Sequence, residues 1–146
     1  MDYVYGELTD KTVTDVACGF QHTACVTNNG DVYTWGYGKS GALGHGDWNQ
    51  VSMPKRVDGL VDIIKVECGN DFTICLDKNG NMYSWGSNRY GQLGITGVNT
   101  YKQNKPIKMI FPHGVTKVID FSCGEEHCAL LTEDGKVFTW GYGNDG

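Results

Sequence analysis

The chain carries short runs in which apolar and polar residues alternate. Phe72, Ile74 and Leu76 precede the Asn-Gly pair at residues 79–80, and Met82 follows it. Because successive side chains of a strand point to opposite faces, this alternation predicts strands with one buried face. An Asn-Gly or Asp-Gly pair between two such runs predicts a hairpin whose type I′ turn needs positive φ at its centre. We therefore expect positive φ at Asn29, Gly30, Asn79, Gly80 and Gly135.

Two further strands accompany each predicted hairpin. An apolar run precedes the second and third Cys-Gly pairs, at residues 61–68 and 115–123, and a fourth short strand fits at residues 54–57 and 106–110. Proline cannot donate a hydrogen bond to a sheet, so the proline that begins each fourth strand predicts an outer edge. No segment shows sustained helical periodicity with caps. Four strands in about fifty residues predict an all-β fold of four-stranded antiparallel β-propeller blades.

The same pattern occurs three times along the chain. In each copy a Cys-Gly pair is followed by the Asn-Gly or Asp-Gly pair and then by Trp-Gly. The cysteine and the tryptophan are 17 positions apart in every copy, whereas successive cysteines are 50 and 55 positions apart. Stacked structural units require such a rigid core with variable links. The copies are marked by Cys18 and Trp35, Cys68 and Trp85, and Cys123 and Trp140, and we place the repeats at residues 8–57, 58–110 and 111–146 of one domain.

Composition narrows the class of protein. Twelve basic and seventeen acidic residues among 146 give a net charge of −5, which argues against direct nucleic-acid binding. No apolar run of eighteen residues and no secretory leader is visible, so we expect a cytoplasmic or nuclear protein without a membrane segment. The 21 glycines indicate many tight turns.

Several aromatic, histidine and cysteine positions have structural interpretations. We expect the tryptophan of each repeat to be buried as a wedge between neighbouring blades. His22 and His127 share a repeat position with Phe72, which favours packed rings over catalytic or metal-binding groups. The six cysteines include no Cys-x-x-Cys pair and are expected to be buried free thiols, although their spacing does not exclude disulfides.

The sequence offers no clear site for a cofactor or for covalent catalysis. Residues 36–41 and 141–146 fit Gly-x-Gly-x-x-Gly, but the residues after position 41 cannot begin the helix that a dinucleotide site needs. No Ser-His-Asp set or nucleophile elbow is visible. We therefore expect no cofactor, no bound metal and no catalytic residue.

The repeat as a whole resembles a known family. The strings Cys-Gly-x-x-His-Thr, Asn-Gly-x-Val-Tyr-x-Trp-Gly and Gly-Gln-Leu-Gly are similar to the repeat of the regulator of chromosome condensation family, over residues 13–146. The resemblance implies a seven-bladed propeller. This chain would then be an incomplete arc of it, ending inside its third repeat, with the remaining blades as partners.

Candidate partner-binding residues lie in the two loops with room for function, residues 39–51 and 88–105. Trp48 is the one tryptophan outside the repeat register, and it either belongs to an interface or covers the blade rim. His45 and Asp47 either serve a metal or partner site or belong to a solvated loop. The lysines after Tyr101 either bind a partner or protect an edge strand from aggregation. The candidates are His45, Asp47, Trp48, Arg89, Tyr90, Tyr101, Lys102 and Lys105.

These features favour a protein-interaction module within a larger regulatory protein. The resemblance also permits guanine-nucleotide exchange on a small GTPase of the Ran type, as in the family's namesake. No counterpart of the namesake's inserted wedge is visible, so no exchange residue is assigned. Light sensing, as in the family's plant ultraviolet-B photoreceptor, is not expected. The Trp and Arg of its Gly-Trp-Arg-His-Thr strings are missing from residues 19–23, 69–73 and 124–128.

Overall fold

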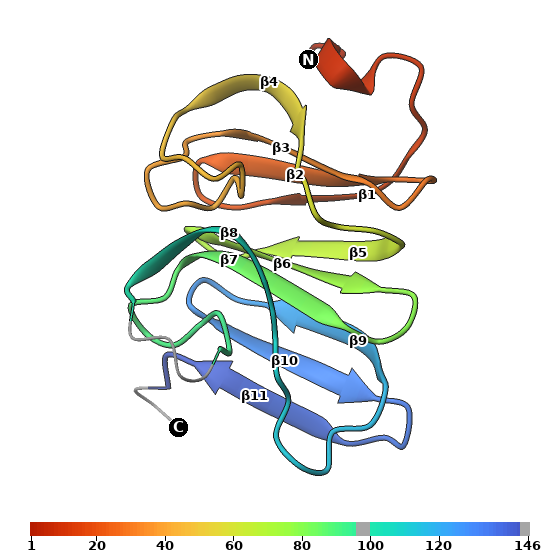
Figure 1. The fold of residues 1–146 in the computed structure, drawn as a ribbon, viewed down its shortest axis with the longest axis vertical. Helices are drawn as coiled ribbons and strands as arrows, with labels where there is room; N and C mark the ends of the chain where they lie inside the picture. The colour runs from red at the N-terminus through yellow and green to blue at the C-terminus, as the bar shows by residue number, and fades with distance from the viewer. Residues whose placement is uncertain (96–99, 144–146) are drawn as a thin grey trace.

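The fold consists of three antiparallel β-sheets that stack side by side along the molecule (Figure 1). A computed structural model describes residues 1–95 and 100–143 of the chain. The sheets hold four, four and three strands in the described residues, and strands that follow one another in sequence are neighbours in each sheet. The expectation of an all-β fold built from antiparallel propeller blades is confirmed. No described helix is long and apolar enough to cross a membrane.

The first blade follows a short 3-10 helix that lies beside its outermost strand. The Glu7 carboxylate of this helix accepts a hydrogen bond of 2.7 Å from the Arg56 backbone N–H. The elements are η1 (Gly6–Leu8), β1 (Val13–Cys18), β2 (His22–Thr27), β3 (Val32–Gly36) and β4 (Val51–Arg56).

The second and third blades repeat this order, and the third has three strands among the described residues. The second blade contains β5 (Ile63–Cys68), β6 (Phe72–Asp77), β7 (Met82–Ser87) and β8 (Lys102–Lys108). The third contains β9 (Val118–Cys123), β10 (His127–Thr132) and β11 (Val137–Gly141). The fourth strands are outer strands as expected, but β4 and β8 begin three and four residues earlier than the prolines suggested.

The hairpin turns differ from the expected type. Gly30, Gly80 and Gly135 have positive φ, at 81°, 89° and 84°, but Asn29 and Asn79 do not. In the first turn the Gly30 N–H donates to the Thr27 carbonyl at 2.9 Å. The turn is therefore a four-residue turn that ends in a left-handed glycine, a common longer hairpin connection. The prediction was wrong for the two asparagines because a single left-handed residue suffices in this turn.

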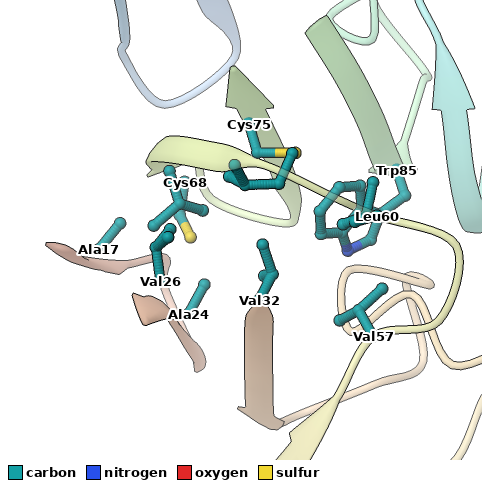
Figure 2. Packing of buried hydrophobic residues seen from close by; sticks show 11 residues of the cluster. Ala17, Ala24, Val26, Val32, Val57, Leu60, Cys68, Cys75 and Trp85 are labelled. Carbon is teal, nitrogen blue, oxygen red and sulfur yellow. The ribbon is translucent and has the colours of Figure 1, made fainter. Parts of the chain in front are cut away.

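The main hydrophobic core lies between blades one and two. Ala24, Val26 and Val32 of the first blade face Cys75 and Trp85 of the second (Figure 2). The link between the blades adds two more buried side chains, Val57 and Leu60. A second cluster joins blades two and three, and its largest members are Phe72, Ile74, Leu76, Met82, Phe121 and Leu130. Strands β6 and β7 of the middle blade thus bury alternate side chains against opposite neighbouring blades.

The repeat tryptophans occupy equivalent places but differ in burial. Trp35, Trp85 and Trp140 lie opposite Thr23, Thr73 and Cys128 in their sheets. Trp85 is fully buried, whereas Trp35 and Trp140 are half-buried, so the expectation holds for one of three. Trp35 packs only on a small cluster with Leu8, and Trp140 belongs to an outer strand of the three-stranded sheet.

The cysteines are all free, but two of them are not buried as expected. Cys25, Cys68, Cys75 and Cys128 are buried, Cys123 is half-buried and Cys18 is exposed. Cys18 and Cys68 both end the first strand of their sheet, but Cys68 packs in the cluster between blades one and two and Cys18 is not part of it.

Candidate functional site

The two loops that carry the candidate residues emerge from the same end of their blades. His22 is paired with Gly36 and Cys18 with Thr23, so the turn at residues 19–21 and the chain after β3 leave the sheet together. The second blade repeats this pairing. We call this end the loop end. The hairpin turns lie at the opposite end, since they join the other ends of the same strands.

The long loop of the first blade folds onto the outer strand of the second. The Gly46 N–H donates to the Asn104 carbonyl at 2.8 Å, which fixes the loop to β8. The Lys102 ammonium lies 4.4 Å from the ring centre of Trp48, in a cation–π contact. The same ammonium donates to the Lys39 carbonyl at 3.4 Å. Trp48 is 41% exposed, so it is held in place and still presents aromatic surface.

A polar cleft of about 500 Å³ opens at the loop end, between the loops and the turns of blades two and three. Four of the eight candidate residues line it, and the sequence reasoning missed the other four lining residues. Tyr101 is 79% exposed, which makes it the most prominent aromatic side chain of the cleft. The lining residues are Ser40, Asp71, Ser87, Arg89, Tyr90, Tyr101, Lys102 and Glu126.

The missed carboxylates have a detectable signal in the repeat. Asp71 and Glu126 both stand three positions after the repeat cysteine, where the first copy has Gln21. Polar residues at one repeat position, in a turn at one end of each blade, place polar groups side by side when the blades stack. Comparing the copies at this position would have placed both carboxylates at the loop end.

The buried amide of Gln92 organises this cleft. Its Nε2 donates to Glu126 Oε2 at 2.8 Å and to Ser87 Oγ at 3.2 Å, and its Oε1 accepts from the Tyr90 N–H at 2.8 Å. Burial raises the pKa of Glu126, and a hydrogen bond from Asn70 works in the opposite direction. Gln92 thereby fixes three parts of the lining without itself being exposed.

The cleft combines aromatic rings with cations that lack a carboxylate partner. Tyr90 packs on Tyr142 of the third blade, with 4.7 Å between the ring centres. Within residues 1–95 and 100–143, Arg89, Lys102 and Lys105 form no ion pair within 4.0 Å. These positive groups stand out on a chain of net charge −5.

The remaining candidates lie beside this cleft or in local contacts. His45 and Lys105 line a neighbouring cleft of about 360 Å³ between blades one and two. His45 Nε2 is 2.9 Å from Thr34 Oγ1, and burial lowers the pKa of His45. The Asp47 carboxylate accepts from the Asn49 N–H at 3.0 Å within its own loop. In the part of the chain that the structure describes, no three His, Cys, Asp or Glu side chains gather as metal ligands.

The two repeat histidines have different surroundings. His22 is buried and bonds a side chain of the next blade, whereas His127 is exposed on the outer face of the third blade. The expectation of a packed structural ring is confirmed for His22 and wrong for His127. The difference follows from surroundings, since the second blade packs against His22 and no described residue covers His127 in the same way.

Comparison with known proteins identifies the repeat. Residues 29–76 and 79–131 match the regulator of chromosome condensation (RCC1) repeat, and a second description of that repeat matches residues 13–42, 63–92 and 118–146. The chain is 38% identical over 131 residues to the ultraviolet-B receptor UVR8 of Arabidopsis thaliana, covering 90% of this chain and 30% of that protein.

Solved structures agree with the sequence comparison. The crystal structure of human WBSCR16 matches with a TM-score of 0.85 and 35% identity, over 91% of this chain and 34% of that one. Yeast RCC1, in its crystal structure with Kap60, matches with a TM-score of 0.77 and 25% identity, over 90% of this chain and 30% of that one. The chain therefore spans about a third of the length of these proteins. With three copies of the repeat in register and three stacked blades, it belongs to the regulator of chromosome condensation repeat family.

Proposed function

We propose that the chain binds a protein partner through its loop end, and that the cleft between Tyr101 and Glu126 receives a segment of that partner. The observation that carries the proposal is the gathering, around one cleft, of exposed aromatic rings and of cations that form no ion pair with any described residue. Protein interfaces are enriched in tyrosine, tryptophan and arginine. Rigid blades beneath the loops reduce the entropy that such a surface loses on binding.

Charge indicates the chemistry of the bound segment. Arg89 and Lys102 line the cleft, and so do the carboxylates Asp71 and Glu126. Within residues 1–95 and 100–143 the two cations form no ion pair, while the Glu126 carboxylate is already bonded by Gln92 and Asn70. Among the described residues Asp71 also forms no ion pair, and Lys102 is held by the Trp48 ring and the Lys39 carbonyl. Arg89 and Lys102 thus offer two positive charges against the single carboxylate of Asp71. We expect an acidic peptide segment that places a carboxylate between Arg89 and Lys102 and packs an apolar side chain on Tyr101.

The test uses the whole chain and labelled peptide pools of defined charge. Fluorescence anisotropy would compare pools of extended peptides rich in Asp, Glu and aromatic residues with pools rich in Lys and Arg. We expect binding of the acidic pool alone, weakened by salt because exposed charges are screened over about 10 Å at 0.1 M. Equal binding of both pools would contradict the proposal.

Charge reversal at the cleft has a matched control. The double substitution Arg89→Glu and Lys102→Glu should weaken binding of the acidic pool by at least about tenfold. The double substitution Lys11→Glu and Lys136→Glu makes the same change of net charge near the hairpin end and should leave binding unchanged. An equal loss in the control would show a diffuse charge effect instead of a site.

A small GTPase of the Ran type is a second candidate partner, favoured by the likeness to yeast RCC1. Exchange factors act by opening the switch regions around phosphate and Mg²⁺, so this activity needs no covalent catalytic group on the chain. Release of a fluorescent guanine nucleotide from a panel of GTPases would measure it. Faster release would support exchange, whereas binding without faster release would support a simple interaction module.

A further inference from the structure

Two cysteines of the third blade face each other across neighbouring strands. Cys123 ends β9 and Cys128 is its direct partner in β10. The Gly124 N–H donates to the His127 carbonyl at 2.8 Å, so the cysteine pair next to it is a non-hydrogen-bonded pair of the ladder. At such pairs the Cα atoms approach to about 4.5 Å, within the range that a disulfide spans. The two Sγ atoms are 2.8 Å apart.

The second cysteine of this pair is peculiar to the third repeat. The equivalent pairs are Cys18 with Thr23 in the first blade and Cys68 with Thr73 in the second. Both threonines stand where the third copy has Cys128. The chain therefore contains two internal examples of the same backbone pairing with a residue that cannot form a disulfide.

Cys123 is open to a reagent from solution. It is half-buried and lines an open recess of about 460 Å³, together with the turns of all three blades. Cys128 is buried directly behind it. This arrangement provides an accessible thiol that a reagent attacks first, and a resolving thiol within contact distance.

We propose that Cys123 and Cys128 are a thiol–disulfide exchange site that takes a low-molecular-weight disulfide, such as oxidised glutathione, as its oxidant. The Cys123 thiolate attacks one sulfur of the glutathione disulfide, whose S–S bond breaks and releases one glutathione thiolate. Cys128 then loses its proton, and its thiolate attacks Cys123 Sγ and releases the second glutathione. Two protein thiols become one disulfide, one glutathione disulfide becomes two glutathione thiols, and the two protein protons go to these products.

The new bond would restrain a turn that reaches the loop-end cleft. Residues 124–127 lie between the two cysteines, and Glu126 in this turn lines the cleft and bonds Gln92. Oxidation would therefore fix the position of one wall of the cleft. The exchange site rests on the pairing of the two cysteines and the partial exposure of Cys123, and it does not depend on the proposed function.

The surroundings of Cys123 determine how fast its thiol should react with oxidised glutathione. A hydrogen bond with Cys128 and burial raise the pKa of Cys123. Since the thiolate is the attacking form, exchange should be slow at pH 7 and become faster as the pH rises.

The test counts free thiols on the whole chain after incubation with oxidised glutathione at pH 8. Alkylation, digestion and mass spectrometry should find one peptide in which Cys123 is joined to Cys128, with the buried Cys25, Cys68 and Cys75 alkylated. The exposed Cys18 should be found alkylated or carrying a glutathione, and it is not part of the link. Six alkylated cysteines at every ratio of oxidised to reduced glutathione would overturn the proposal, as would a link from Cys123 to Cys68.

Two variants sharpen the result. Cys128→Thr introduces the residue of the other two blades, so it should keep the fold, abolish the link and leave a mixed glutathione disulfide at Cys123. Cys18→Ser removes the exposed thiol and should leave the link intact. Thermal melting gives an independent measure, because closing a short loop should raise the Tm of the wild type by a few degrees and that of Cys128→Thr not at all. If Cys128→Thr fails to fold, peptide mapping and melting of the wild type still decide the question.

Discussion

The imidazole of His22 in the first blade lies 3.0 Å from the hydroxyl of Thr73 in the second. The Thr73 hydroxyl donates at 2.8 Å to the Ala42 carbonyl, so it accepts from the His22 Nε2–H. A buried chain of two hydrogen bonds thus crosses between the blades. At the next interface the equivalent positions hold Phe72 and Cys128, which pack in an apolar cluster. The two interfaces thus share one backbone arrangement. The first fills it with a polar pair, His22 and Thr73, and the second with an apolar pair, Phe72 and Cys128.

This buried histidine predicts a defined dependence of stability on pH. Burial lowers the pKa of His22 to about 4 from its usual 6.5. Between these values the unfolded chain binds a proton that the folded chain does not, so the free energy of unfolding falls as the pH drops from about 6.5 to 4. The shift corresponds to a loss of about 3 kcal/mol. His22→Phe, which copies Phe72, should lack this loss in urea titrations from pH 7.5 to 4.

The comparison of wild type with His22→Phe separates this histidine from other titrating groups. Burial raises the pKa of Glu67 and Glu126, so these carboxyls change stability in the opposite direction as the pH falls. Their contributions are the same in both proteins and cancel in the difference. A difference that stays constant over this pH range would contradict the role assigned to His22.

Gly44, which packs against Trp85 of the next blade, should not tolerate a side chain. A Cβ on Gly44 would lie 2.8 Å from Trp85 Nε1, and Gly44 has a φ of 79°. Gly59 has a similar φ of 85° but open space around it. We expect Gly59→Ala to lower the free energy of unfolding by about 1–2 kcal/mol, through backbone strain alone. Gly44→Ala should lower it by at least about 2 kcal/mol more, because its Cβ also meets Trp85. Chemical denaturation of both variants measures the difference, and equal losses would show that the contact with Trp85 is unimportant.

The difference in burial among the repeat tryptophans predicts a difference in stability. Trp85 is fully buried between blades one and two, whereas Trp35 packs against the small cluster around Leu8. Trp85→Ala should lower the free energy of unfolding by about 3–5 kcal/mol, and Trp35→Ala should lower it clearly less. Urea unfolding followed by circular dichroism would test this ranking. Equal costs would mean that the wedge contributes little between the blades.

The outer face of the third blade predicts association of the isolated chain. Val137 is 66% exposed and lines an apolar surface recess with Ala129 and Leu131. In the first blade the equivalent strand face is covered by the second blade. We expect sedimentation to show concentration-dependent association that Val137→Lys reduces. Val61→Lys, at a residue that is 68% exposed in the link between blades, is the matched control. A monomer at all concentrations would contradict the expectation.

Repetition made much of the fold predictable from sequence. Three copies with one spacing identified the strands, the hairpins and the stacking, because each copy repeats the same local signals. The turn type was not predictable, since Asn-Gly is compatible with both a type I′ turn and a turn that needs only Gly30 at positive φ. The unequal burial of Trp35 and Trp85 depends on which neighbours a blade has, and the repeat pattern carries no information on that.

The candidate site was predictable only in part. Exposed aromatics and cations in long loops marked Arg89, Tyr90, Tyr101 and Lys102, which the structure places around one cleft. Asp71 and Glu126 come from short turns that look like ordinary hairpin connections. The repeat places these carboxylates at the loop end, but their contact with the loops depends on how each loop folds, and the loop sequences differ between copies and carry no repeated signal for that.

The contact of Trp85 with Gly44 recurs between Trp140 and Gly94, whose added Cβ would lie 2.9 Å from the indole nitrogen of Trp140. The second repeat therefore carries both halves of the contact, with the Trp85 indole toward the first blade and the Gly94 backbone toward the third. A tandem duplication of such a repeat places a tryptophan of one copy against a glycine of the other, so the new interface needs no further substitution. An array of blades can therefore lengthen by duplication without a compensating substitution at the new interface. The loop sequences are then free to diverge while the contacts between blades are kept.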